Sequence, residues 1–326
     1  MSYEVHHGDC IEFMRTMPDS SVDSIVTDPP YGLGFMGKAW DALPPGLEWA
    51  AECLRVLKPG GHLLAFGGTR TWHRLALSIE DAGFEIRDSI AWMYGSGFPK
   101  HRATLKPAFE PIVMARKPFK GSLTANEATH GTGALSIDEC RVPTNEPTGR
   151  PQGKDIRGGN YGPGGYESRS SLITGGSELG RWPANVVLDE DMAGVLNEVS
   201  EPQMHSAGAA RERSGDFNNK GMFGLGGGKT ARLGDSGGAA RFFYVAKAPK
   251  KERPVVDGVA HATVKPLTLM RWLVRLVTPT GGTVLEPFAG SGTTVEACIL
   301  EGFHCIAIER EAEYLPLIQK RIERAA

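Results

Sequence analysis

Apolar and polar residues alternate in two distinct patterns along the first 117 residues. Short apolar runs predict buried strands, whereas apolar residues spaced three and four apart predict amphipathic helices. The helical pattern is clearest at residues 47–57, and Lys58-Pro59-Gly60-Gly61 is a typical helix exit. The expected strands are residues 3–7, 22–27, 62–66, 84–94 and 111–115, and the expected helices are residues 9–17, 47–57 and 71–82.

The same alternation returns near the C-terminus. Strands are expected at residues 242–246, 283–285 and 304–308, and helices at 266–277, 293–300 and 311–325. Pro266 suits the first turn of a helix, where its missing N–H costs nothing. Strands that alternate with helices predict an α/β fold with a doubly wound, mostly parallel sheet, which the C-terminal block completes.

The stretch between these two blocks has a different composition. Residues 121–240 hold 24 of the 42 glycines and only short apolar clusters, such as Trp182-Pro183-Ala184-Asn185-Val186-Val187-Leu188. Such a stretch is either a disordered insertion or a loop-rich module that a partner orders, and we expect a mixture. The predicted organisation is therefore residues 1–120, a glycine-rich insert at 121–240, and residues 241–326.

Bulk composition excludes several classes of protein. Hydrophobic content is 40% and charged content 23%, ordinary values for a soluble globular chain of 326 residues. No apolar run reaches the roughly 20 residues of a membrane span, and the N-terminus lacks a signal-peptide pattern, so a cytoplasmic protein is expected. The five cysteines include no C-x-x-C pair, which predicts reduced thiols, and the histidines lack metal-ligand spacing, so no metal site is expected.

Charge is unevenly distributed. The net charge of −2 argues weakly against a nucleic-acid partner. However, six cationic residues lie between Pro99 and Gly121 with Glu110 as the only acid, and nine Lys or Arg lie between Gln203 and Lys251. A basic surface on a nearly neutral protein suits phosphate binding on one face. The alternative is that these side chains are simply solvated.

One polar-aromatic loop is expected after the strand at 22–27, in the sequence Thr27-Asp28-Pro29-Pro30-Tyr31. An exocyclic base amine is a poor nucleophile because its lone pair delocalises into the ring, so its methylation needs acceptors that hold the nitrogen. The Asp28 carboxylate and the Pro29 carbonyl, on backbone that proline restricts, fit that need. Tyr31 offers a face on which a flipped base could stack. The alternative is an ordinary turn with a capping Asp.

A second loop, Glu286-Pro287-Phe288-Ala289-Gly290-Ser291-Gly292, joins an expected strand to an expected helix. Glycine turns at this position serve many nucleotide cofactors, and plain topology is the alternative. Glu309 ends the next strand, where a carboxylate can bind ribose hydroxyls, unless it is only a surface acid. No Lys follows the glycines, so a sulfonium cofactor without phosphates fits better than ATP.

Together and in this order, the two loops resemble those of the β-class DNA amino-methyltransferases. In that family the catalytic motif precedes a target-recognition insert and the cofactor motif follows it, a circularly permuted order. Three further stretches match: Gly8-Asp9-Cys10, Arg55-Val56-Leu57-Lys58-Pro59-Gly60-Gly61 and His261-Ala262-Thr263-Val264-Lys265-Pro266. The resemblance covers residues 1–117 and 241–326, and Ala262 departs from it, since the family often has proline there.

The resemblance implies S-adenosylmethionine as cofactor and a role for each matching residue. Asp28 and Pro29 would hold the target amine, Tyr31 would stack on the base, and Pro30 would complete the catalytic loop. DNA contacts are expected from the insert and from Lys100, Arg102 and Lys106. At the methionine part of the cofactor, the contacting residues would be Phe288, Gly290 and Gly292, with Glu286 and Ala289 beside them. Glu309 would bind the cofactor's ribose and Asp9 its adenine. Lys265 would lie near the cofactor's carboxylate. Helix capping is the alternative for Asp9, and a solvated charge for Lys265.

The leading expectation is a site-specific methyltransferase that acts on adenine N6 in double-stranded DNA, with the target base flipped out. Aspartate before Pro-Pro-Tyr favours adenine in this family, and cytosine N4 is the close alternative. Methyltransferases of RNA or of protein glutamine are another alternative, but they usually place the glycine loop first, so the order of the loops argues against them. A DNA-binding protein with a decayed methyltransferase domain is a further alternative, but decay should have removed these motif residues. No cysteine lies in a Pro-Cys loop, which disfavours cytosine-C5 chemistry and leaves direct in-line transfer. A monomer or homodimer in a bacterial or virus-infected cytoplasm, in the context of restriction-modification, would fit this family.

Overall fold

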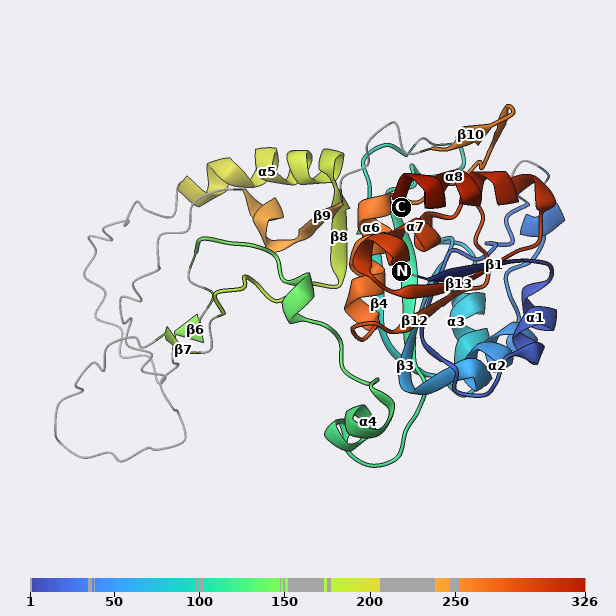
Figure 1. Cartoon of the computed structure of the whole chain (residues 1–326). Helices are drawn as coiled ribbons and strands as arrows, with labels where there is room; N and C mark the ends of the chain where they lie inside the picture. Colours follow the sequence, from blue (N-terminus) through green and yellow to red (C-terminus); the bar gives the residue numbers. More distant parts are fainter. Residues whose placement is uncertain are drawn as a thin grey trace, which may run out of the picture.

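The computed structural model describes residues 2–34, 37, 39–97, 99, 102–146, 148, 150–151, 173–174, 177–205, 238–246 and 253–325. Its centre is a nine-stranded sheet with the order β1-β13-β12-β2-β3-β5-β4-β8-β9 (Figure 1). The strands are β1 (Tyr3–His7), β13 (His304–Glu309), β12 (Thr283–Glu286), β2 (Val22–Thr27), β3 (Leu57–Phe66), β5 (Phe109–Arg116), β4 (Glu85–Met93), β8 (Val186–Asp189) and β9 (Tyr244–Ala246).

Strand direction is uniform in this sheet except at β5. Strand β5 is antiparallel to both of its neighbours, β3 and β4. Every other neighbouring pair in the sheet is parallel. The first residues of β5 therefore lie at the edge of the sheet where the other strands end. This confirms the prediction of a mostly parallel sheet.

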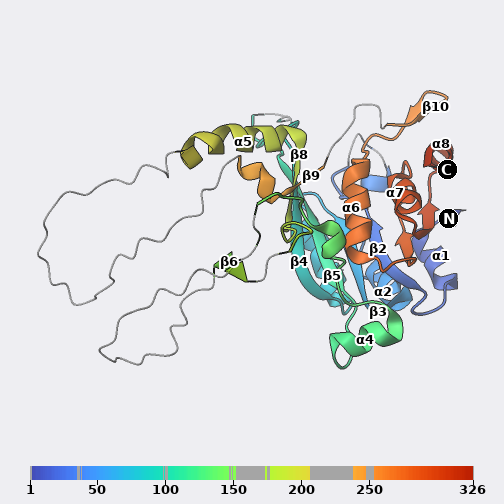
Figure 2. The same ribbon diagram turned by 60° about the vertical axis from the view of Figure 1, so that its left-hand side comes forward.

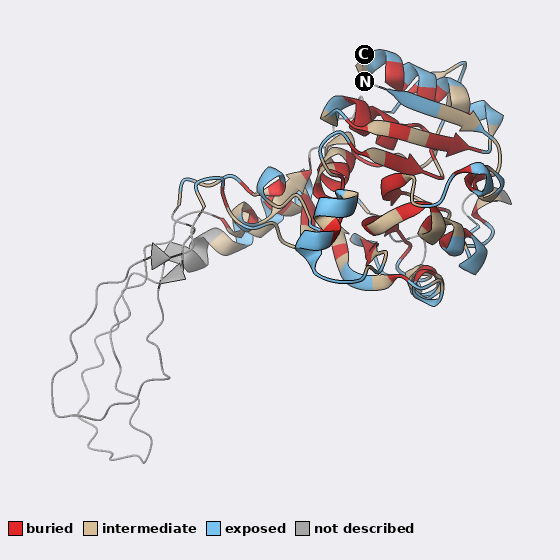
Figure 3. Cartoon of the chain, turned by 60° about the horizontal axis from the view of Figure 1, so that its bottom comes forward, coloured by how far each residue is buried: buried red, intermediate tan, exposed pale blue. Residues whose placement is uncertain are grey.

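Helices cover both faces of the sheet and bury two separate cores (Figure 2). On β2, Val26 packs into one core and Ile25 into the other, because successive side chains of a strand point to opposite faces. Burial on both faces explains the continuous apolar runs, and buried residues follow the strands in Figure 3. One face carries α6 (Leu267–Val277), α7 (Thr293–Glu301) and α8 (Leu315–Ala325), and the other carries α1 (Cys10–Thr16), α2 (Leu47–Val56) and α3 (Trp72–Asp81).

The predicted helix exit at residues 58–61 lies inside β3. Helix α2 ends at Val56, but β3 begins at once, earlier than the expected residue 62. The pairing of β3 with β2 shifts between Val22 and Ser24, so the extra residues form an irregularity in the strand. Gly60 adopts a φ of +82° there, a conformation that favours glycine and explains why the helix-exit residues occur within a strand.

Parts of the glycine-rich range 121–240 pack directly on the sheet. The Asn126 amide donates to the Pro59 carbonyl at 2.9 Å, and β8 lies between β4 and β9. The boundaries at 121 and 240 stay a prediction, and most of the glycine runs lie outside the described residues. Described elements in or near this range are α4 (Leu123–His130), η3 (Asp138–Cys140), β6 (Arg150–Pro151), β7 (Ile173–Thr174), α5 (Glu190–His205) and η5 (Ala239–Phe242).

The remaining short elements are η2 (Ala39–Asp41), the hairpin of β10 (Val255–Val256) and β11 (Val259–Ala260), and η6 (Ala312–Tyr314). All five cysteines are buried and free. Within the described part of the chain, no helix is both long and apolar enough to cross a membrane. The same residues contain no cluster of three or more His, Cys, Asp or Glu side chains that could hold a metal ion.

Candidate active site

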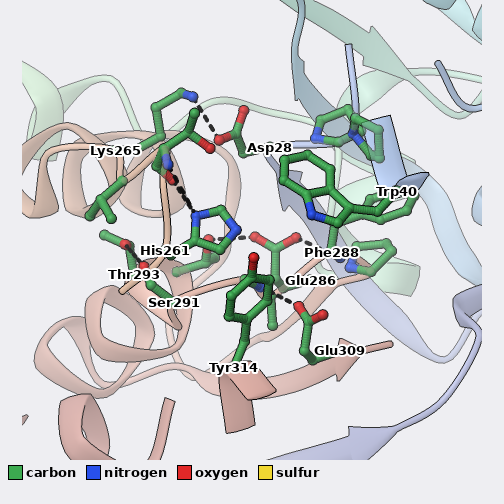
Figure 4. A pocket seen from close by; sticks show the side chains of 18 of the residues that line it. Asp28, Trp40, His261, Lys265, Glu286, Phe288, Ser291, Thr293, Glu309 and Tyr314 are labelled. Carbon is green, nitrogen blue, oxygen red and sulfur yellow. Dashed lines mark hydrogen bonds and ion pairs between the residues drawn. The ribbon is translucent and has the colours of Figure 1, made fainter. Parts of the chain in front are cut away.

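A cavity of about 330 Å³ opens at the edge where the parallel strands end. Strands β1, β13, β12 and β2 are neighbours, so the residues that follow them meet at this edge. The volume lies in the range of small-molecule sites. In Figure 4, Asp28 and Lys265 face each other on one side of the cavity, and Glu309 and Tyr314 lie on the other.

Four side chains on the first side form a closed cluster, which we call the Asp28 cluster: Asp28, Tyr31, Glu110 and Lys265. The Lys265 ammonium lies 2.6 Å from Asp28 Oδ2 and 3.3 Å from Glu110 Oε2. The Tyr31 hydroxyl lies 2.9 Å from Asp28 Oδ1 and 3.0 Å from Glu110 Oε2. A phenol has one proton, so Tyr31 cannot donate fully to both carboxylates at once.

Electrostatics keep the Asp28 cluster charged. Burial alone would lower the pKa of Lys265, but the Asp28 and Glu110 carboxylates outweigh burial and raise it. Burial and the same two carboxylates raise the pKa of Tyr31 well above its ordinary value. Lys265 is therefore an ammonium and Tyr31 a neutral phenol at neutral pH. The cluster holds two carboxylates, Asp28 and Glu110, and only one ammonium, Lys265. This excess of hydrogen-bond acceptors favours a ligand that brings N–H donors.

Asp41 fixes the backbone of the loop that carries Tyr31. Its Oδ1 accepts from the Tyr31 N–H at 2.7 Å and the Gly32 N–H at 2.9 Å, and its Oδ2 accepts from the Leu33 N–H at 3.3 Å. Asp41 is buried although it is charged, and these hydrogen bonds stabilise it there. Sequence reasoning missed this residue, since nothing in its neighbourhood signals a partner ten residues upstream.

The glycine loop after β12 lies against β13 and α8. Gly290 and Gly292 have φ of +52° and +81°, and a Cβ on Gly292 would lie 2.9 Å from the Ile318 Cα. The Gly290 N–H donates to Glu309 Oε2 at 2.6 Å, and the Glu311 N–H donates to Oε1 at 2.8 Å. Burial raises the pKa of Glu309, which is only 7% exposed and so is no surface acid.

Glu286 joins three elements at the base of the cavity. Its carboxyl accepts hydrogen bonds from the hydroxyls of Thr27 on β2 and Thr294 on α7, and from the Phe288 N–H at 3.0 Å. Burial raises the pKa of Glu286 to about 8. The carboxyl is therefore mostly neutral at pH 7 and acts as a clamp between β12, β2 and α7.

Aromatic rings form one wall of the cavity. The His261 ring lies 5.9 Å from Trp40 in a stacked arrangement and 4.6 Å from Tyr314 edge to face (Figure 4). Its Nδ1 lies 2.7 Å from the Thr263 carbonyl, which orients the ring. Rings at these positions suit a planar heterocycle. Sequence reasoning gave none of the three a role, although His261 begins a stretch that matched the family.

A family model described as DNA methylase matches residues 22–320. The chain belongs to this N6/N4 DNA methylase family. The resemblance drawn from the two loops is thereby confirmed.

Relatives match this chain over part of its length. DNA adenine methyltransferase YhdJ of Escherichia coli (strain K12) is 33% identical over 149 residues, 42% of this chain and 50% of that protein. Type II methyltransferase M.HinfI of Haemophilus influenzae is 28% identical over 144 residues, 37% of this chain and 40% of that protein. The matched stretch thus spans half or less of each relative.

The fold has a counterpart among solved structures. PvuII DNA methyltransferase (cytosine-N4-specific) superimposes with a TM-score of 0.50 at 14% identity, and the match covers 98% of this chain and 86% of that one. At this identity the likeness concerns the fold alone. It agrees with the doubly wound sheet expected from the sequence.

Most of the site residues predicted from the sequence line the cavity. They are Asp9, Asp28, Pro29, Pro30, Tyr31, Lys265, Glu286, Phe288, Ala289, Gly290 and Glu309. Gly292 lies at the start of α7, behind the loop.

Two of these positions bear on the alternatives left open by the sequence. Asp9 Oδ1 caps α1 by accepting from the Ile11 N–H at 2.9 Å and the Glu12 N–H at 3.2 Å, so Asp9 combines capping with a place at the cavity. Lys265 is buried against Asp28 and is not a solvated charge.

Of the predicted DNA contacts, Arg102 and Lys106 are not among the residues that line the cavity. Arg102 and Lys106 belong to the connection between β4 and β5, which leads back to Glu110 at the site. Lys100 lies outside the described residues. Glu110 itself was noted in the sequence only as the single acid in a basic stretch, and that isolation was the one signal that could have drawn attention to it.

Proposed function

We propose that this chain is a site-specific DNA methyltransferase that transfers a methyl group from S-adenosylmethionine to N6 of adenine. The observation that carries the proposal is the Asp28 cluster, which shares one cavity with the glycine loop and Glu309. The choice of adenine is supported by the aspartate before Pro-Pro-Tyr and by the similarity to YhdJ.

The cavity residues fit S-adenosylmethionine. At Gly292 a Cβ would collide with α8, so the turn passes close to that helix and leaves the Gly290–Ser291 backbone facing the cavity. Glu309 has each oxygen bonded to one backbone N–H, and each retains a lone pair for a ribose hydroxyl. The His261 and Tyr314 rings offer faces for adenine. When bound, the cofactor supplies an electrophilic methyl group on a sulfonium.

The residues of the chain then orient the nucleophile. The Asp28 carboxylate and the Pro29 carbonyl accept the two N–H bonds of the target amine, which turns the nitrogen lone pair toward the methyl group. The excess negative charge of the Asp28 cluster stabilises the positive charge that develops on nitrogen. Asp28 acts as an acceptor, and the amine proton leaves after methyl transfer.

A covalent route through cysteine is disfavoured. Cys10 is the cysteine among the cavity-lining residues, and burial raises its pKa to about 12. Such a thiol is not ionised at neutral pH and is a poor nucleophile. Direct transfer between the cofactor and an exocyclic amine needs no such nucleophile.

The substrate is proposed to be double-stranded DNA with the target base flipped into the cavity, where Tyr31 stacks on it. Lys100, Arg102, Lys106 and residues 121–240 supply the phosphate and base contacts. A monomer or a homodimer fits this function.

The test is single-molecule methylation sequencing of DNA from a host without DNA methyltransferases, expressing wild type, Asp28→Ala or, as a surface control, Asp81→Ala. We expect N6-methyladenine at one short sequence in the wild type and the control, and none in Asp28→Ala. Asp28→Ala should still bind S-adenosylmethionine in calorimetry. N4-methylcytosine would correct the base, and activity of Asp28→Ala within about tenfold of wild type would refute this catalytic site.

A further inference from the structure

Glu110 reaches the active site because β5 runs against the other strands. It is the second residue of β5 and pairs with Trp92 near the end of β4. Had β5 been parallel, its first residues would lie at the opposite edge of the sheet. The Glu110 side chain is 21% exposed and lies within hydrogen-bond distance of the Tyr31 hydroxyl.

The Asp28 carboxylate is occupied as the structure stands. Tyr31 bonds to Oδ1 and Lys265 to Oδ2. A target amine that approaches Asp28 must compete with both donors. The same two donors also contact one oxygen of Glu110, at 3.0 Å for the Tyr31 hydroxyl and 3.3 Å for the Lys265 ammonium. For Tyr31 the contact with Glu110 is 0.1 Å longer than the contact with Asp28, and for Lys265 it is 0.7 Å longer.

We propose that Glu110 is a positioning residue for methyl transfer, which takes over the hydrogen bonds of Tyr31 and Lys265 when the target amine binds Asp28. This inference rests on the proposed function. Glu110 acts through these two side chains and does not touch the amine itself. Small shifts of the Lys265 and Tyr31 side chains suffice, because Glu110 is already within reach of both.

The charge of Glu110 is the essential property. With a neutral side chain at this position, Lys265 would be drawn fully to Asp28, and the pair would neutralise the acceptor that the amine needs. Tyr31 would likewise keep Asp28 as its stronger acceptor. With the carboxylate in place, the cluster retains a net negative charge when the amine arrives. Glutamine keeps the size and removes this charge.

The test compares Glu110→Gln with Glu110→Asp. The matched control is Glu85→Gln. Glu85 on β4 pairs with Arg116 on β5, and neither residue lines the cavity. Single-turnover methylation is measured with labelled S-adenosylmethionine and unmethylated plasmid DNA. We expect Glu110→Gln to slow transfer about 10- to 100-fold, the effect of one charge-assisted hydrogen bond, with cofactor affinity and melting temperature near wild type. Glu110→Asp should recover part of the rate, and Glu85→Gln should methylate like the wild type.

Tyr31→Phe supplies a second variant that removes only the hydroxyl. If Glu110 acts through that hydroxyl, the double variant Tyr31→Phe/Glu110→Gln should be slower than the wild type by less than the product of the two single-variant factors. Multiplicative effects would overturn the coupling. A wild-type methylation rate in Glu110→Gln would overturn the proposal. It would also be overturned if Glu110→Gln lost rate, cofactor affinity and stability in parallel and Glu110→Asp recovered none of the rate.

Failure of the proposed function gives a different result. A wild-type protein that binds S-adenosylmethionine but methylates no DNA would refute that function, and the role of Glu110 in transfer with it. Activity in the wild type together with an unaffected Glu110→Gln variant refutes only the role of Glu110.

Discussion

Glu286 should make the protein less stable as the pH rises from acid to mildly alkaline values. Its carboxyl is buried between β12, β2 and α7, and burial raises its pKa from 4.5 to about 8. Below pH 4.5 the group is neutral in both the folded and the unfolded state and has no effect on their balance. Above pH 4.5 the unfolded chain ionises it, whereas the folded chain keeps it neutral until about pH 8.

The size of the effect follows from this pKa shift. Each unit corresponds to about 1.4 kcal/mol, so the free energy of unfolding falls by up to about 5 kcal/mol between pH 4.5 and 8. Glu286→Gln removes the ionisation and keeps one oxygen for the Phe288 N–H. The Thr27 hydroxyl donates to that same oxygen, so the mismatch is confined to the Thr294 hydroxyl at the other position, and it should cost about 1 kcal/mol at any pH. The variant is therefore slightly less stable at pH 5 and more stable, by about 2–4 kcal/mol, at pH 8.5.

Urea denaturation of both proteins at pH 5, 7 and 8.5 measures this crossover. The comparison isolates Glu286, because other buried groups contribute equally to both proteins. His62, whose pKa burial lowers to about 4, is one such group. A difference between wild type and Glu286→Gln that stays constant across these pH values would refute a raised pKa at this carboxyl.

Two further predictions concern the glycine loop after β12 and the proposed DNA contacts. Gly292→Ala should destabilise the protein by about 2–4 kcal/mol and weaken S-adenosylmethionine binding in calorimetry, because a Cβ there meets Ile318 at a φ of +81°. Gly302→Ala is the control, since Gly302 has a φ of +80° but nothing lies within 4 Å of the added Cβ. Equal losses of stability in the two variants would contradict the packing argument. Arg102→Ala/Lys106→Ala should weaken DNA binding and reduce the slope of log affinity against log salt by up to about 2, whereas Arg87→Ala at the other end of β4 should not. An unchanged slope would remove these two residues from the DNA contact.

The alternation of strands and helices was predictable because both faces of the sheet are buried. All six residues of β2 are buried, including the polar Asp23, Ser24 and Thr27, and the strand was predicted from its apolar Val22, Ile25 and Val26. The direction of β5 was not predictable, since residues 111–115 are apolar whichever way the strand runs. That direction decides which edge of the sheet receives Glu110, and so the sequence could not assign it to the site.

Short strands that need partners were also beyond sequence reasoning. The apolar cluster that contains Val187 and Leu188 was noted, but β8 is ordered by its pairing with β4 and β9. The partner of Lys265 is 237 residues away in sequence, so its ion pair with Asp28 had no local signal. The two loops, by contrast, were recognisable because each needs particular residues at fixed local spacing.

The permuted order of the two loops is compatible with the chemistry because they follow strands that pair directly. Asp28 follows β2 and Phe288 follows β12, and these strands are parallel neighbours, about 4.8 Å apart. Buried polar contacts hold the two strands and their flanks together: Ser24 Oγ lies 2.8 Å from Thr278 Oγ1, and the Thr283 N–H donates to Asp23 Oδ2 at 2.8 Å. The spacing between the loop after β2 and the loop after β12 is thus set by strand pairing and not by the connecting chain. A long insert between them can therefore change without moving the two loops relative to each other.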